Sequence, residues 1–132
     1  MSFWQLYYHL VWATKKREPV IGEEAADLIR RSIQAICTDR RVLVHAVGVM
    51  PEHVHLAVSI PPRISISEFA QRVKGGTSHL VNRSIQQPVG DWFFWQLEYG
   101  VPSFGKRSLE TAVHYVENQP AHHADGNLWP LL

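Results

Sequence analysis

Residues 50–60, MPEHVHLAVSI, place two histidines one residue apart in a run that otherwise has the composition of a buried β-strand. Alternate side chains of a strand point to opposite faces of its sheet, so His53 and His55 share a face, roughly 7 Å apart at the backbone. The other face is entirely apolar: Val54, Leu56, Val58 and Ile60. We therefore expect one face of this strand to pack into a core and the other to present two imidazoles.

Three more segments have the aromatic and β-branched composition of strands. They span residues 3–13, 42–50 and 92–101, and the histidine strand itself covers 53–60 after a turn at Pro51 and Glu52. Because proline cannot donate to a strand ladder, Pro61 and Pro62 are expected to end that strand. The sequence thus predicts four strands.

Helices are expected between these strands. Residues 23–37 carry apolar side chains at helical spacing, and Ser65 with Glu68 has the form of a capping box that opens a second helix. The adjacent Gly75 and Gly76 are expected to weaken or bend that second helix near its middle.

A third helix is predicted from near Ser108 to the residue before Pro120. The resulting order, β-α-β-β-α-β-α, begins with the six elements of the ferredoxin-like split βαβ arrangement. We predict an α+β fold in a single domain, residues 1–132, with an antiparallel sheet, both main helices on one face and a C-terminal helix added. The opposite face would be open, and His53 and His55 would point there.

Composition excludes several classes of protein. Hydrophobic residues make up 45% and charged residues 19%, which argues against disorder. No apolar run reaches the roughly 18 residues of a membrane span, and no signal peptide is evident. Cys37 is the only cysteine, so an internal disulfide and a CxxC metal site are excluded. We expect Cys37 to be a small core residue and the location to be cytoplasmic.

The net charge of +1 gives only weak support for a nucleic-acid partner. Basic residues nevertheless gather after the first strand and in the second helix, at Lys15, Lys16, Arg17, Arg72 and Lys74. Solvated surface is the simpler interpretation of these charges.

The histidine pair also has two interpretations. The two histidines can simply be polar residues on a half-exposed sheet. Alternatively, they can bind a metal ion, which holds both imidazoles neutral and so removes the repulsion between adjacent protonated rings. Two ligands make a weak site, so a third must come from elsewhere.

The last predicted helix carries Tyr115 and Gln119 at positions i and i+4, stacked on one helical face. An interfacial tyrosine and a surface glutamine are the plain alternatives to a functional role. His122 and His123 fit either surface residues or an anion site, and spacing alone does not separate these.

Four segments together resemble a known family: LVWATKKREPV (10–20), MPEHVHLAVSIPP (50–62), VKGGTSHLV (73–81) and YVENQPAHH (115–123). The chain resembles the single-tyrosine transposases of the HUH superfamily, found in small insertion sequences and among the REP-associated tyrosine transposases. The triplet of two histidines around a hydrophobic residue is not specific by itself. Followed about sixty residues later by Tyr-x-x-x-Gln, it is a strong signal.

The resemblance implies a role for each matching residue. His53 and His55 match the metal-binding histidines, Gln119 the third ligand and Tyr115 the nucleophile. It further implies Mg²⁺ or Mn²⁺, a single-stranded DNA substrate with hairpin ends, a covalent 5′-phosphotyrosine, and a homodimer whose active sites combine residues of both subunits. The five basic residues are then candidates for phosphate contacts.

Other functions remain open on the residues alone. The same fold could serve as a non-catalytic or domesticated module that binds single-stranded nucleic acid. A metallohydrolase using metal-bound water would need an acidic group beside the histidines, for which Glu52 is the nearest candidate. A metal-free oligomerisation domain is the third alternative.

Overall fold

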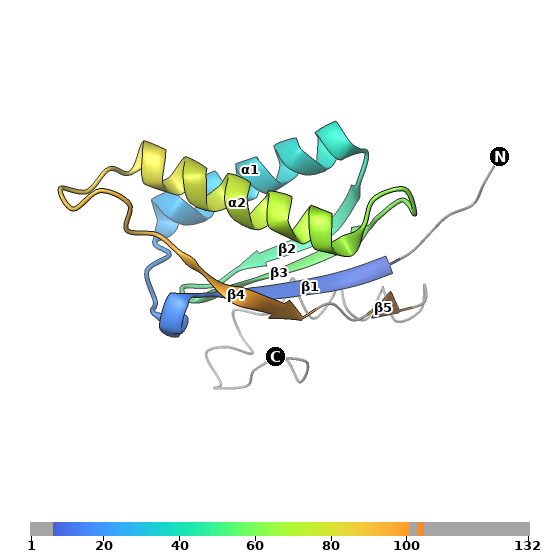
Figure 1. Ribbon diagram of the computed structural model, residues 1–132, viewed down its shortest axis with the longest axis horizontal. Coiled ribbons are helices and arrows are strands. Elements are labelled where there is room, and N and C mark those ends of the chain that lie inside the picture. The colour runs from blue at the N-terminus through green and yellow to red at the C-terminus, as the bar shows by residue number, and fades with distance from the viewer. Residues whose placement is uncertain (1–6, 101–102, 105–132) are drawn as a thin grey trace.

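The computed structural model describes residues 7–100 and 103–104, in which two helices cover one face of an antiparallel sheet (Figure 1). The elements are β1 (Tyr7–Thr14), the short 3₁₀ helix η1 (Lys15–Arg17), α1 (Glu23–Arg40), β2 (Leu43–Val49), β3 (His53–Ser59), α2 (Ile66–Ser84), β4 (Trp95–Gly100) and β5 (Ser103–Phe104). No helix within these ranges has the length and apolar character needed to cross a membrane.

The strand order β2-β3-β1-β4 is that of the ferredoxin-like fold, as predicted. β1 and β3 lie at the centre and pair antiparallel, with Leu10 opposite Leu56 and Val11 opposite His55. β2 flanks β3, and β4 flanks β1, where the short β5 also pairs. The two histidines of β3 therefore lie on an inner strand.

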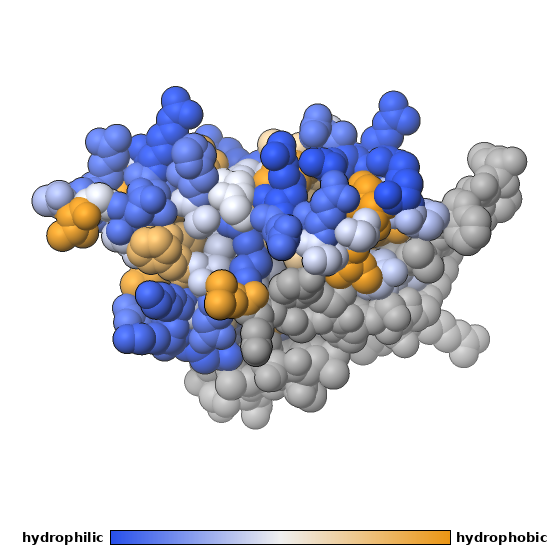
Figure 2. Space-filling model, in the orientation of Figure 1, coloured by the Kyte–Doolittle hydropathy of each residue, from blue (hydrophilic) through white to orange (hydrophobic). Residues whose placement is uncertain are grey.

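The core forms between the sheet and the helices. Leu10 and Leu56 from the central strands pack with Ile29 of α1 and Val73 of α2, all fully buried. Burial of each such side chain contributes about 1.5–3 kcal/mol relative to exposure. The outer surfaces of the helices in view are mainly hydrophilic (Figure 2). Each helix is thus held by its apolar stripe.

Cys37 is confirmed as a core residue. It is buried in the cluster beneath α1, and this burial raises the pKa of its thiol to about 12. A thiol that stays protonated is a poor nucleophile and a poor metal ligand.

β4 begins later than the predicted strand 92–101, at Trp95. Asn82 of α2 holds the preceding residues instead: its Oδ1 accepts from the backbone N–H groups of Trp92 and Phe93, and its Nδ2 donates to the Phe93 carbonyl, each at 2.9 Å. These bonds replace a strand ladder with a side-chain clamp. Residues 3–6 of the first predicted strand and the whole helix predicted from Ser108 lie outside the described residues.

The N-cap bond of the predicted capping box is present, since Ser65 Oγ accepts from Glu68 N–H at 3.0 Å, while Glu68 Oε1 accepts from Arg40. However, Gly75 and Gly76 do not interrupt α2, which continues to Ser84. A Cβ atom on Gly76 would lie 2.8 Å from Cδ1 of Ile36, whereas one on Gly75 would contact nothing within 4 Å. Gly76 therefore permits the close approach of α1 and α2, and packing compensates for its low helix propensity.

This difference gives a matched pair of variants. Gly75→Ala should raise the free energy of unfolding by about 0.5–1 kcal/mol, because alanine is the better helix former and the site is open. Gly76→Ala should gain less or lose stability, because Ile36 must move. Urea denaturation of both variants measures this, and equal stabilisation by the two would contradict the close helix contact.

Candidate active site

The site is a cluster of three histidines on the sheet face opposite the helices. His53 and His55 of β3 and His9 of β1 each have 0% exposed surface. The His55 ring centroid lies 4.8 Å from that of His53 and 4.9 Å from that of His9. The expectation that the pair points to an open face is therefore wrong. Two central strands hold the imidazoles against each other, where neighbouring residues enclose them.

Each histidine of the pair has a hydrogen-bond partner at Nδ1. His53 Nδ1 lies 2.9 Å from Glu52 Oε1, and His55 Nδ1 lies 2.8 Å from His9 Nε2. An ionised carboxylate only accepts, so Nδ1 of His53 carries the proton. When His55 Nδ1 likewise donates to His9, Nε2 becomes the basic nitrogen of both rings. Such partners fix the tautomer and orientation of metal-ligating histidines in proteins.

Burial also sets the protonation of the cluster. Desolvation lowers the pKa of His9 from 6.5 to about 4. The pKa of His55 falls to about 2, first because of burial and then because of repulsion by His9, His53 and Arg17. Neutral imidazole is the form that ligates metal ions. The neutral state of His55, the Nδ1 hydrogen bonds of both rings and the imidazole donor type therefore fit a divalent ion.

The remaining predicted site residues are not placed by the structure. Tyr115, Gln119, His122 and His123 lie outside the described residues. Within the described part of the chain, no three side chains of histidine, cysteine, aspartate or glutamate form a group that could hold a metal ion. A metal site on His53 and His55 would thus need a ligand of another type or from another segment.

The basic residues after β1 form one exposed turn. Lys15, Lys16 and Arg17 make up η1, and the last two have left-handed backbone angles, with φ of 57° and 52°. Thr14 anchors this turn through two hydrogen bonds. Its hydroxyl donates to the carbonyl of Glu18 at 2.7 Å, and its backbone N–H donates to the carbonyl of Glu52 at 2.9 Å. The turn is therefore attached directly beside the histidine cluster.

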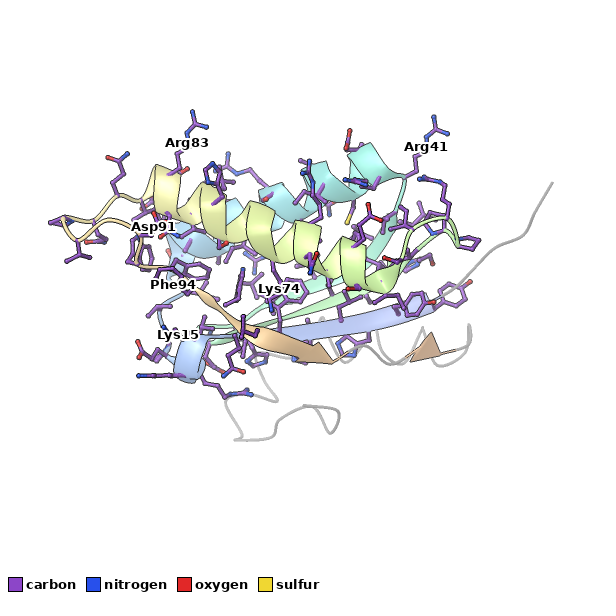
Figure 3. The ribbon with its side chains drawn as sticks, viewed as in Figure 1. Lys15, Arg41, Lys74, Arg83, Asp91 and Phe94 are labelled. Atoms are coloured by element: carbon purple, nitrogen blue, oxygen red, sulfur yellow. The ribbon has the colours of Figure 1, made fainter. Side chains whose placement is uncertain are left out.

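Arg72 and Lys74 lie on α2 and differ in their surroundings. Arg72 is exposed, whereas Lys74 is half-buried and donates to the backbone carbonyl of Gln96 in β4 (Figure 3). Burial also lowers the pKa of Lys74. Two residues apart on a helix, these side chains project in directions about 160° apart. Only the three cations of η1 form a local basic cluster among the five predicted contacts.

The family model for IS200-like transposases matches residues 2–119. This chain belongs to the IS200-like transposase family. The ISDra2 transposase TnpA of Deinococcus radiodurans is 27% identical over 119 residues, which cover 88% of this chain and 85% of that protein. The IS200 transposase of Salmonella typhimurium is 24% identical over 119 residues, covering 88% and 78%.

Two solved structures share the fold of this transposase. A putative transposase from Deinococcus radiodurans has a TM-score of 0.71 and 30% identity, covering 89% of this chain and 93% of that one. A REP-associated tyrosine transposase, solved bound to a REP hairpin, has a TM-score of 0.68 and 19% identity, covering 99% and 81%. The predicted family is confirmed.

His9 is the site residue of the transposase that sequence reasoning missed. A signal was present, because Leu10 and Trp12 alternate with it and assign it to the face opposite the core. In the ferredoxin-like strand order, that face of β1 adjoins the same face of β3. The sequence offers Glu52 as the nearest acidic group for a metallohydrolase, whereas in the structure it is the hydrogen-bond partner of His53.

The buried cluster should make this transposase sensitive to acid. A histidine whose pKa is lowered on folding contributes fully above the unfolded value of 6.5, and that contribution is lost as pH falls toward the folded value. For His9, with a folded pKa of about 4, the loss of stability from pH 7 to 4.5 is about 2 kcal/mol. Urea unfolding in EDTA measures it. His9→Gln should reduce the slope, and an unchanged slope would contradict the assignment.

Proposed function

We propose that this transposase cleaves and rejoins single-stranded DNA through a covalent phosphotyrosine on Tyr115. The observation that carries the proposal is the pair of buried imidazoles, each hydrogen-bonded at Nδ1, of which His55 is kept neutral by burial that lowers its pKa. His53 and His55 would hold Mg²⁺ or Mn²⁺ through Nε2, and Gln119 would supply an amide oxygen. Neutral ligands leave the charge of such an ion available to polarise the phosphodiester.

Tyr115 would be the nucleophile of the cleavage step. Its phenolic oxygen bonds to phosphorus, and the bond from phosphorus to the 3′ oxygen of the preceding nucleotide breaks. That oxygen takes up a proton and leaves as a free 3′-OH. The new ester preserves the energy of the broken bond, so a second 3′-OH can attack it and displace Tyr115. Strand transfer therefore needs no nucleotide hydrolysis.

The substrate is proposed to be single-stranded DNA with hairpin ends. The fold is shared with a transposase solved bound to a REP hairpin, and the basic turn Lys15–Arg17 lies beside the histidine cluster. These three cations are the strongest candidates for phosphate contacts, and Arg72 is exposed for the same use. Lys74 is the weaker candidate, because its ammonium already donates to the Gln96 carbonyl.

We also propose a homodimer of single-domain subunits, residues 1–132, with composite active sites. Residues 99–108, YGVPSFGKRS, run from the end of β4 through β5 toward the segment bearing Tyr115 and contain two glycines and one proline. Such a connection allows Tyr115 of one subunit to serve the histidine pair of the other. Two-fold symmetry would then give two equivalent sites.

The nucleophile is tested with a labelled single-stranded oligonucleotide, Mg²⁺ or Mn²⁺, and a denaturing gel. The wild-type protein should form a covalent adduct, and Tyr115→Phe should form none. EDTA and His55→Ala should both abolish cleavage while DNA binding persists. Cleavage that survives in Tyr115→Phe would instead indicate a hydrolase with metal-bound water, and binding without cleavage in every sample would indicate a non-catalytic module.

The composite site is tested by mixing two inactive proteins. After subunit exchange between His55→Ala and Tyr115→Phe, one site of each heterodimer combines an intact histidine pair with an intact tyrosine, so cleavage should return. If each site lay within one chain, every site would keep a lesion. An inactive mixture in which native mass spectrometry confirms heterodimers would rule out shared sites.

A further inference from the structure

Phe94 is an exposed aromatic side chain on a firmly anchored backbone. Its ring is 47% exposed, while Phe93 beside it is fully buried. Asn82 clamps the residues before it, and Trp95 after it donates from Nε1 to Thr77 Oγ1 at 2.9 Å. The ring is therefore held outward by a fixed scaffold, which is an unusual position for a phenylalanine.

Lys15 lies directly beside the exposed Phe94 ring. Its backbone N–H donates to the Phe94 carbonyl at 2.9 Å, and its Nζ lies over the Phe94 ring, 5.7 Å from the centroid (Figure 3). Lys15 and Phe94 also line two neighbouring hollows, of about 600 and 220 Å³. We call Lys15 and Phe94 with these hollows the aromatic platform.

The two hollows differ in character. The larger is completed by Trp95, Gln96 and Leu97, of which Leu97 is 96% exposed. The smaller is completed by Thr14, Lys16, Glu18, Val20 and Trp92. The larger hollow offers apolar surface beside one amide, which suits a flat heteroaromatic ring with hydrogen-bonding edges. Its volume lies within the range of about 300–1,000 Å³ typical of small-ligand sites.

Charge favours a nucleic acid as the occupant. The platform adjoins three exposed cations in sequence, Lys15–Arg17, with Glu18 as the opposing acid. Exposed aromatic rings beside cations are the combination by which proteins hold unpaired bases and their phosphates. An apolar protein partner would gain nothing from three adjacent cations.

The platform also lies close to the histidine cluster. Thr14 precedes Lys15, and its backbone N–H bonds the carbonyl of Glu52, whose carboxylate bonds His53. In β1, Ala13 is paired directly with His53. A strand crossing the platform would therefore reach the proposed cleavage site within a short span.

We propose that Phe94 stacks an unpaired base of the DNA strand leading to the His53–His55 site, while Lys15 binds the adjoining phosphate. This inference rests on the proposed function, because it takes single-stranded DNA as the substrate. The inference adds to that function a binding position for one DNA base, at residues separate from those proposed to carry out cleavage. Recognition by stacking is tolerant of base identity, so the platform holds the strand without selecting its sequence.

The test is fluorescence anisotropy of a labelled single-stranded oligonucleotide with the full chain in EDTA, which prevents cleavage. Phe94→Leu keeps the apolar side chain but removes the aromatic face, and it should weaken binding about 5- to 150-fold. Phe94→Trp should retain the wild-type affinity. Lys15→Gln should lower the salt dependence of binding by about one counterion. Val89→Ala, at a residue that is 85% exposed in the loop before Trp92, is the matched control and should change nothing.

The outcomes separate the two proposals. If the wild-type protein binds and cleaves the strand but Phe94→Leu binds as tightly, the platform is wrong and the proposed function stands. If Phe94→Leu and Phe94→Trp lose affinity equally, stacking is not the cause and the platform again fails. If the wild-type protein binds no single-stranded DNA at all, both proposals fail. Thermal unfolding of each variant confirms that the fold is intact.

Discussion

The antiparallel pairing of β1 with β3 is the constraint on which the site depends. Its register sets Val11 opposite His55 and Ala13 opposite His53, which brings His9 diagonally to His55. A slip of β3 by one residue would turn His53 and His55 to the helix side and Leu56 away from it. The hydrophobic core therefore fixes the register, and the register in turn places the histidines. The stability of the core and the geometry of the histidine cluster therefore both depend on the hydrogen bonds between β1 and β3.

Periodicity was enough to predict the fold and the faces of its strands. The alternation from His53 to Ile60 assigned Val54 and Leu56 to the core, and the structure agrees. Periodicity gives a direction for each side chain but no account of what surrounds it. The ring contact and the hydrogen bond between His9 and His55 join two strands that are far apart in sequence. These tertiary facts could not follow from local spacing.

Two other differences between the predicted and the observed structure also arise from contacts between elements far apart in sequence. Gly75 and Gly76 look like a helix breaker in isolation, but the approach of Ile36 from α1 makes a small residue necessary at position 76. The beginning of β4 is likewise decided by Asn82, a side chain from another element. Of the candidate site, the sequence predicted the histidine pair and the basic turn. For His9 the sequence supplied the face and the strand order, but the contact with His55 also depends on the β1–β3 register, which local spacing does not give.

The left-handed backbone at Lys16 and Arg17 places two selective pressures in conflict. Glycine would relieve a cost of about 1–3 kcal/mol at each such position, yet it would also remove the positive charge. Selection for stability alone would therefore exchange these cations for glycines, as it does in many tight turns. A chain that keeps lysine and arginine there accepts a less stable turn to retain its charge. This turn is thus a point where a more stable protein and a more strongly charged one would have different sequences.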